Sequence, residues 1–331
     1  MAVTIEEVFP AAFRPDQVIN HTSGYLALNR HNRRFTIDGV PGFIAYREQG
    51  KHLISIGGIH APSEHQESLL DGFLAEAERR RRRMLAVQVP ESQAQFFFER
   101  RFTVNQMGTS FGRRLAEFSL RGTRHVKLRN KIKRAREAGM RVAEIGRDIM
   151  ADDRIFARVR DVSAAWLRRK KKKELDFMIG EIGGPEDRER RTFVVFDAAE
   201  RVIGFITYVP VWGEYPGYLH DLTRRVPDAP PGAMEFCNLF AMERFVSEGV
   251  AHLHFGFTPF IIDPARRPFE KPFLSWVMTM LGRYGKSIYP AQSQSKYKLK
   301  WGPDIIEREF IACRALSLRA ILDLLIVTRS I

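Results

Sequence analysis

The chain has 331 residues, of which 44% are hydrophobic and 28% are charged, a balance typical of a folded globular protein and not of a disordered one. Two cysteines exclude a disulfide-rich scaffold and a cysteine-based zinc module. No stretch reaches the roughly 18 uncharged apolar residues of a membrane-spanning helix, and the first residues lack a signal-peptide pattern. We therefore expect a soluble, cytoplasmic protein.

The formal net charge is +14, and the excess of positive charge is local. Residues 79–140 contain 17 Lys and Arg but only four acidic residues. A concentrated positive field attracts phosphates, so nucleic acid is the first candidate partner and an anionic membrane surface the second. Each single basic run can also be an ordinary solvated helix face, and that alternative stays open.

Strands and helices alternate through the first half of the chain. In chain order we expect strands at 41–48 and 51–59, a helix from Ser63 to about Arg83, a strand at 84–90, a helix at 91–101 and a strand at 115–120. Ser63 followed by Gln66 is the pattern of a capping box at the start of the first helix.

The basic segment 123–138 predicts a helix that stops at Gly139. Leu128, Ile132 and Ala135 follow each other at helical spacing, and almost every other position is Arg or Lys. This narrow apolar stripe can dock the helix on the protein and leave its cations outward.

The second half repeats the alternation. We expect strands at 141–145, 192–197, 202–212, 217–222, 252–257 and 308–314, and helices at 152–173, 234–248, 273–284 and 315–328. Interleaved elements of these lengths predict an α/β or α+β fold. We expect two domains, 1–138 with the basic helix and 139–331 as the catalytic one.

One candidate site is the segment GYLHDLTRRVPDAPPGAMEF, residues 217–236. Asp221 on a strand is followed three residues later by Arg224, and a turn with three prolines then leads into a helix near Gly232. The prolines restrict the backbone, and the start of the helix is a candidate site for an anion or a carbonyl. The alternative is an Asp–Arg ion pair with no chemical task.

A second candidate site is SQSKYKLKWGPD, residues 293–304. In an extended chain its lysines share one face, with Tyr297 and Trp301 on the other. Cations interleaved with aromatic rings suit a ribose-phosphate backbone with a stacked base. The alternative is an edge strand protected by lysine against aggregation.

Several motifs are absent. The sequence has no phosphate-binding P-loop, no dinucleotide-binding glycine motif and no G-x-S-x-G elbow. His252 and His254 lack a third metal ligand nearby in sequence, so we expect no metal site there. We expect no cofactor.

From about Phe118 to Cys313 the chain resembles the cytosolic catalytic domain of the lysyl- and alanyl-phosphatidylglycerol synthases. The matching stretches are FSLRGTRHVKLRNKIKRAREAGM, VSAAWLRRKKKKELDFMIG, DAAERVIGFITYVPVW, HDLTRRVPDAPPGAMEF, HFGFTPF and SKYKLKWGPD. The resemblance implies two tandem acyltransferase-like domains of the kind shared with GCN5-related N-acyltransferases (GNAT). It also implies transfer of an amino acid from aminoacyl-tRNA to an acceptor hydroxyl or amine.

Site residues follow from the same resemblance. It implies catalytic roles for Asp221, Arg224 and Lys298, and Trp301 stands where the family has Tyr or Phe. The expected substrate-binding residues are Trp301, Tyr297, His220 and Phe257. The expected tRNA-binding residues are Lys127, Arg129, Lys131, Arg134, Lys170, Lys171, Lys172, Lys296 and Lys300.

Four hypotheses on function stay open. The first is an aminoacyl-tRNA-dependent transferase with a small-molecule acceptor, as in free-standing relatives that transfer serine to a hydroxylamine in antibiotic assembly. The second is a peripheral phosphatidylglycerol aminoacyltransferase, with the amphipathic segment 315–328 on an anionic membrane. The third is an acetyl-CoA N-acetyltransferase, although residues 136–141 match its phosphate loop incompletely. The fourth is a tRNA- or membrane-binding module without catalysis.

Overall fold

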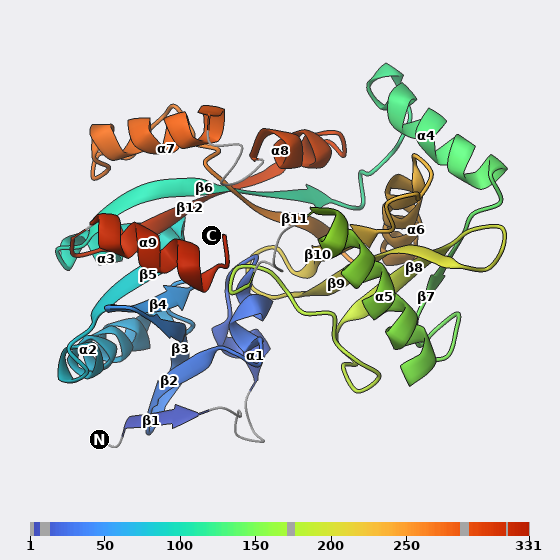
Figure 1. Ribbon diagram of the computed structural model, residues 1–331. Coiled ribbons are helices and arrows are strands. Elements are labelled where there is room, and N and C mark those ends of the chain that lie inside the picture. The colour runs from blue at the N-terminus through green and yellow to red at the C-terminus, as the bar shows by residue number, and fades with distance from the viewer. Residues whose placement is uncertain (1–2, 7–13, 171–175, 285–290, 316, 331) are drawn as a thin grey trace.

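The computed structural model describes residues 3–6, 14–170, 176–284, 291–315 and 317–330 (Figure 1). Within these ranges, twelve strands form one continuous sheet. The strands are β1 (Val3–Glu6), β2 (Arg33–Ile37), β3 (Val40–Gln49), β4 (His52–Ile56), β5 (Arg83–Pro90), β6 (Thr103–Arg114), β7 (Arg141–Glu144), β8 (Arg191–Phe196), β9 (Val202–Val211), β10 (Gly217–Arg225), β11 (His252–Pro259) and β12 (Ile305–Cys313).

Helices cover both faces of this sheet. They are α1 (Pro15–Val18), α2 (Ser63–Arg79), α3 (Glu91–Glu99), α4 (Val126–Glu137), α5 (Asp153–Lys170), α6 (Ala233–Ser247), α7 (Pro272–Tyr284), α8 (Ala291–Leu299) and α9 (Leu318–Val327), with short 3-10 turns at Gly24–Leu28 and Thr123–His125. The mixed α/β fold expected from the alternating pattern is confirmed.

The two halves of the chain repeat one arrangement. The strand order is β1-β2-β3-β4-β5-β12-β6-β11-β10-β9-β8-β7. The parallel neighbours among these strands are β4 with β5, joined through α2, and β10 with β11, joined through α6. All other neighbours are antiparallel. Each half therefore has one parallel pair connected by a long helix.

Two elements pack across the expected domain boundary at residue 138. Strand β12 lies between β5 and β6 of the first half, and α9 packs on β3 and β4. The basic helix α4 was expected with the first domain, yet it packs on α6 in the second half. The apolar stripe explains this placement, because Leu128, Ile132 and Ala135 join the core around α6.

Separate apolar cores form on the two faces of each half. The first half packs α2 and α3 on one face and α9 on the other. The second half packs α4 and α6 on one face and α5 on the other. The helix expected at 123–138 is confirmed, with its three stripe residues at most 5% exposed and Gly139 at φ +72° after its end.

Three local expectations are wrong. Residues 115–120 do not form the expected strand, because the strand in this region is β6, which begins earlier and ends at Arg114. Ser63 is the first residue of α2 and not its cap, and Gln66 Nε2 donates to the carbonyl of Ala61. Residues 291–299 form helix α8 and not an extended strand, so its lysines point in different directions.

Candidate functional site

The parallel strands β10 and β11 separate in the middle of the sheet. They pair from Gly217 with His252 to Leu219 with His254, although both strands continue beyond this point. The side chain of Lys298, from α8, reaches carbonyls of β11 beyond the last paired residues. Its ammonium donates to the carbonyl oxygens of Gly256 at 2.7 Å and Phe257 at 2.8 Å. Lys298 therefore satisfies backbone groups in a stretch where β10 does not pair with β11.

Lys298 is 7% exposed, and burial lowers the pKa of its ammonium to about 7. The nearby carboxylate of Glu309 acts in the opposite direction. An ammonium has three N–H groups, and two of them are used by carbonyls of β11. Among the described residues, no hydrogen-bond partner is found for the third N–H.

The expected substrate-binding residues lie around this lysine in different ways. His220 is buried, its ring lies 3.1 Å from Asn238 Oδ1, and burial lowers its pKa to about 3, so it is neutral at pH 7. Trp301 is fully buried and stacks on Phe255, so its ring is part of the core and is not placed to stack on a nucleobase. Tyr297 lines a cavity at the start of α6.

This cavity has a volume of about 340 Å³, within the range of small-molecule sites. Its lining combines the proline turn, the start of α6, α4 and α8: Lys131, Trp166, Thr223, Arg225, Pro230, Pro231, Gly232, Ala233, Met234, Glu235 and Tyr297. Gly232 precedes the helix at φ +98°, and a Cβ there would lie 2.3 Å from the carbonyl oxygen of Lys131. Only glycine allows α4 and the start of α6 to approach this closely.

Cations surround this end of α6. Glu235 Oε1 accepts hydrogen bonds from Lys131 at 3.1 Å and from Lys300 at 2.9 Å. The Lys300 ammonium also lies 3.7 Å from the centre of the Tyr297 ring. Burial favours the neutral form of Glu235, but the two lysines outweigh it and lower its pKa. Two cations share one carboxylate at the positive end of a helix, so the local field suits an anionic ligand.

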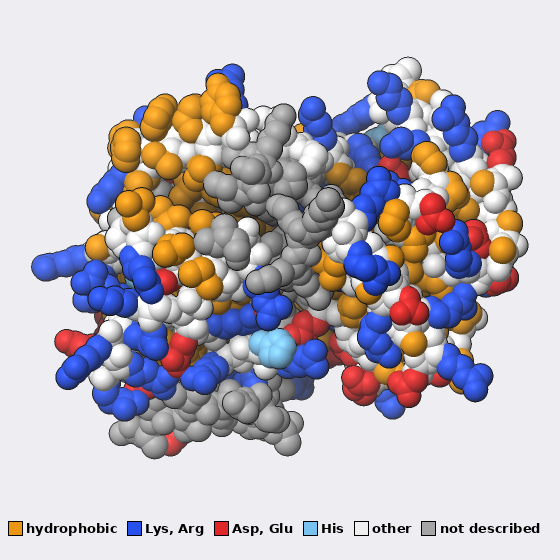
Figure 2. Space-filling model, in the orientation of Figure 1, with side chains coloured by type: hydrophobic (Ala, Val, Ile, Leu, Met, Phe, Trp, Pro, Cys, Tyr) orange, Lys and Arg blue, Asp and Glu red, His pale blue; other side chains and the backbone are white. Residues whose placement is uncertain are grey.

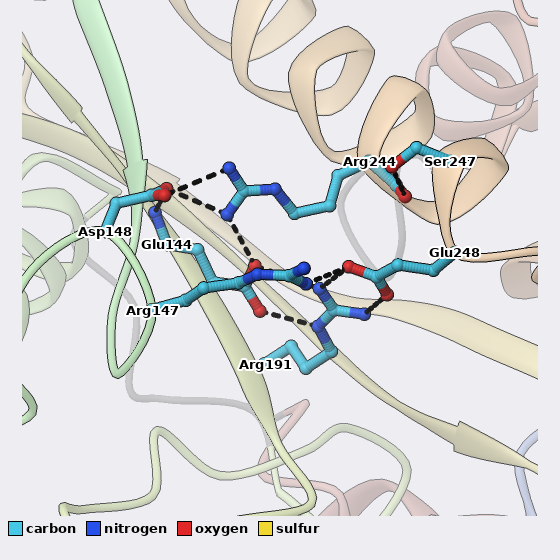
Figure 3. A network of polar contacts seen from close by, with 7 residues as sticks. All are labelled: Glu144, Arg147, Asp148, Arg191, Arg244, Ser247 and Glu248. Atoms are coloured by element: carbon cyan, nitrogen blue, oxygen red, sulfur yellow. Dashed lines mark hydrogen bonds and ion pairs between the residues drawn. The ribbon is translucent and has the colours of Figure 1, made fainter.

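An ion network holds the other end of α6 (Figure 3). Arg244 of α6 donates to Glu144 Oε2 at 2.9 Å and to Asp148 Oδ1 at 3.0 Å. Arg191 donates to Glu144 Oε1 at 2.6 Å and to Glu248 Oε1 at 2.9 Å. The network links α6 to β7 and β8, and so fixes the direction of the helix whose N-terminus lines the cavity.

Asp221 is in a buried ion pair with a residue that the sequence analysis missed. Its Oδ2 accepts a hydrogen bond from Arg190 Nη1 at 2.6 Å, and both side chains are less than 5% exposed. Its Oδ1 accepts the N–H of Gly180 at 2.9 Å. Burial raises the pKa of Asp221, and Arg190 opposes this change. The Asp221–Arg224 pair considered from spacing is replaced by a pair with Arg190.

Arg224 lies on the α5 side of the sheet. Its Nη1 donates to Ser163 Oγ, and its guanidinium lies 5.4 Å from the centre of the Trp166 ring. The side chain is 3% exposed. Trp166 also lines the cavity at α6, so Arg224 supports one wall of that cavity.

The expected tRNA-binding cations lie on α4, at the end of α5 and in or directly after α8. Lys127, Lys131 and Arg134 are exposed on α4, and Figure 2 shows Lys and Arg gathered over this helix. Arg129 is half-buried and donates to backbone carbonyls, including that of Gly122 at 2.7 Å. Lys296 on α8 is exposed. Lys171 and Lys172 lie outside the described residues, as does the side chain of Lys170, the last residue of α5.

The two strand histidines have structural partners. His252 Nδ1 lies 2.9 Å from the carbonyl oxygen of Pro216, and His254 Nε2 lies 2.8 Å from that of Tyr215. Among the described residues, no group of three or more His, Cys, Asp or Glu side chains is placed to hold a metal ion. In the same part of the chain, no helix is both long and apolar enough to cross a membrane.

The chain thus combines one continuous mixed sheet, a parallel pair of strands that separates in its second half, and a cavity at the start of the helix that joins this pair. The chain belongs to the family described as phosphatidylglycerol lysyltransferase, C-terminal, whose sequence profile matches residues 12–313. The resemblance inferred from the sequence is confirmed.

Solved structures of low sequence identity share this fold. The C-terminal domain of a protein assigned as a lysylphosphatidylglycerol synthetase from Agrobacterium fabrum has a TM-score of 0.78 at 18% identity, covering 95% of this chain and 94% of that one. The structure of L-PGS from Bacillus licheniformis has a TM-score of 0.76 at 18% identity, covering 93% and 91%. FemX has a TM-score of 0.52 at 11% identity, covering 88% and 89%.

Curated sequences that the chain matches are much longer proteins. The lysylphosphatidylglycerol biosynthesis bifunctional protein LysX of Mycobacterium marinum is 25% identical over 198 residues, which are 57% of this chain and 17% of that protein. LysX of Mycobacterium tuberculosis is 29% identical over 143 residues, 43% of this chain and 12% of that protein. The chain therefore matches less than a fifth of each of these relatives.

Proposed function

We propose that this chain transfers an amino acid from aminoacyl-tRNA to a hydroxyl, hydroxylamine or amine of a small-molecule acceptor. The observation that carries the proposal is the cavity at the start of α6, which lies beside the exposed cations of α4. A charged tRNA presents phosphates next to a small esterified amino acid, and this site offers a cationic surface next to a cavity. The reaction belongs in the cytoplasm, where charged tRNA is found.

The chemistry needs little from the protein. The donor ester is already activated, so the acceptor oxygen or nitrogen attacks the carbonyl carbon and the ester C–O bond breaks. The proton that the acceptor loses is balanced by the proton that the ribose oxygen gains as it leaves as an alcohol. We assign the free N–H of Lys298 to the oxyanion or to the leaving ribose oxygen. Asp221 and Arg224 position the site: Asp221 holds the loop at Gly180 through its backbone, and Arg224 supports Trp166.

The proline turn argues against acetyl-CoA as the donor. Pyrophosphate at a helix start is held by successive backbone N–H groups, and proline has none. Pro230 and Pro231 occupy the positions directly before Gly232. A loop built in this way cannot supply the usual set of donors to a pyrophosphate.

The test is discharge of tRNA. We would incubate the protein with a complete set of charged tRNAs, each carrying a labelled amino acid, and measure which ester is lost in the presence of a nucleophile such as hydroxylamine. We expect one aminoacyl-tRNA to be discharged well above its spontaneous rate, and the Lys298→Ala variant to leave it intact. Thermal stabilisation by acetyl-CoA without any discharge of tRNA would overturn the proposal.

A second candidate, a peripheral phosphatidylglycerol aminoacyltransferase, is favoured by an exposed apolar face on α7 and α9. Phe273 is 69% exposed, Trp276 57% and Leu318 86%, and Figure 2 shows hydrophobic side chains grouped over these helices. Apolar side chains on a basic protein suit the interface of an anionic bilayer.

Flotation with phosphatidylglycerol vesicles separates the two candidates. Binding that is lost in a triple variant with serine at positions 273, 276 and 318, together with aminoacylation of the lipid, would establish the second candidate. Phosphatidylcholine vesicles are the control for charge.

A further inference from the structure

A second cavity of about 250 Å³ lies away from the start of α6. Its walls come from four parts of the chain: residues 20–22, residues 90–92 after β5, the connection between β9 and β10 at 211–215, and residues 306–309 of β12. Strand β5 pairs with β12 only from Pro90 opposite Glu309 onward, so residues 305–308 of β12 extend past the end of β5. This cavity lies where β12 loses one of its two neighbours.

Glu309, a buried acidic residue, lines this cavity, and only part of its hydrogen-bonding capacity is used. Glu309 is 2% exposed, and its Oε1 accepts a hydrogen bond from Ser110 Oγ. Its Oε2 is buried without a hydrogen-bond partner, and Nε2 of the His21 ring lies 3.8 Å from it. A buried carboxyl oxygen without a partner is unfavourable, and Glu309 is one of the residues that line the cavity.

Besides Glu91, which is paired with Arg267 and Arg308, two further acids line the same space, Glu214 and Glu307. Glu307 lies two residues before Glu309 on β12, and its Oε2 accepts from the hydroxyl of Thr22. Burial and Glu214 both raise the pKa of Glu307. Acids placed so close together favour a bound positive charge.

The basic groups in the wall do not neutralise these acids. Arg308 donates to Asp263 Oδ2 at 2.6 Å and to Glu91 Oε1 at 3.2 Å, so its charge is already balanced. Burial lowers the pKa of His21 to about 3, so its ring is neutral at pH 7. The cavity therefore offers acidic groups and no free cation among the residues described as lining it.

We propose that this cavity binds the acceptor, and that the acceptor carries a protonated amine that contacts Glu309. The inference rests on the proposed function and names its acceptor class. Trp212 and Tyr215 in the wall provide aromatic surface for a cationic nitrogen or its alkyl chain. A phosphodiester headgroup such as that of phosphatidylglycerol is anionic, and the residues described as lining this cavity offer it no free cation.

The titration of Glu309 agrees with this assignment. Burial raises its pKa to about 8, while Ser110 and Lys298 lower it and Glu307 raises it. A bound ammonium stabilises the carboxylate and releases its proton, which relieves the unsatisfied oxygen.

The test measures binding without tRNA. Calorimetry with n-butylammonium chloride, 1-butanol and sn-glycerol 3-phosphate separates cationic, neutral and phosphorylated probes. We expect butylammonium alone to bind, with affinity reduced about tenfold in Glu309→Gln and clearly reduced in Glu307→Gln. Glu64→Gln, an exposed glutamate at the start of α2, is the matched control and should leave affinity unchanged. Thermal melts establish that each variant is folded.

Two results overturn the inference: butylammonium binding that neither cavity variant changes, or preferential binding of glycerol 3-phosphate. Discharge of charged tRNA in the separate assay, without any binding of amine, leaves the proposed function standing and rejects this acceptor class. Binding of amine without any discharge of tRNA rejects the proposed function and the acceptor assignment with it.

Discussion

The ammonium nitrogen of Lys298 lies 2.7 Å from the carbonyl oxygen of Gly256, beyond the last residue pair of β10 and β11. A lysine from a later helix thus occupies a position that a neighbouring strand fills elsewhere in the sheet. The charge that we assign to the reaction is held by two backbone carbonyls, and the acidic group of Glu309 lies near enough to affect its pKa.

Replacing Lys298 tests this assignment. Lys298→Ala should lower turnover about 100-fold or more, because a preorganised donor to the oxyanion is lost, while retention of tRNA on a filter stays unchanged. Since the pKa of Lys298 is about 7, the wild-type rate should fall as pH rises through this value. The exposed Lys51, in the turn between β3 and β4, provides the control, and Lys51→Ala should keep full turnover. Equal rates for both variants would reject the assignment.

The buried pair of Asp221 and Arg190 predicts a stability effect. Asp221→Ala removes the closer of the two carboxylates that pair with the buried Arg190 guanidinium and leaves it with Asp187 alone, so we expect a loss of about 3 kcal/mol in the free energy of unfolding by urea. The double variant Asp221→Leu with Arg190→Met should recover part of this loss, because neither charge remains. An Asp221→Ala protein that is as stable as wild type and yet inactive would point to a chemical role for the carboxylate.

The cations of α4 predict salt-dependent binding of tRNA. Changing Lys127, Lys131 and Arg134 to glutamate should weaken binding and reduce the slope of log affinity against log salt by about 2–3, as expected for loss of that many phosphate contacts. Reversal of Arg79, Arg81 and Arg83 is the matched control. These three are exposed at the end of α2, on the other half of the molecule from α4 (Figure 1). A control that weakens binding as much would mean that α4 is not the tRNA surface.

Glu309 predicts a pH dependence of stability. Its pKa is about 8 in the folded protein against 4.5 ordinarily, so between these values the folded state binds more protons than the unfolded state. This contribution to stability is present below pH 4.5 and is lost as pH rises towards 8. Glu309→Gln removes it and should flatten the fall in unfolding free energy between pH 5 and 7 by up to about 1.4 kcal/mol per pH unit. Urea titrations at several pH values measure the slope, and parallel curves would contradict the prediction.

Much of the fold could be predicted because patterns in the local sequence determine where helices and strands begin and end. The stripe of Leu128, Ile132 and Ala135 predicted the basic helix, and glycine at 139 predicted its end. The alternation of lysine in residues 296–300 wrongly indicated an extended segment, because every second residue is lysine although the segment folds as a helix. The burial of Lys298 and the carbonyls of β11 decide that conformation, and neither is visible in the local sequence.

The candidate site was predicted less completely. Asp221 was found from its segment, but its partner Arg190 comes from a distant loop that no spacing rule connects to β10. Glu307 and Glu309 had a local signal, since they alternate within a strand that is otherwise apolar towards its end. Their meaning depends on the loss of β5 as a neighbour, which is a property of sheet order.

The position of β12 between β5 and β6 has a consequence for synthesis on the ribosome. Until residues 305–313 have left the exit tunnel, the facing edges of β5 and β6 have no strand between them, so these two strands wait for a segment that is made much later than they are. The growing chain carries two open edges during this time, and a chaperone that shields them would raise the yield of native protein.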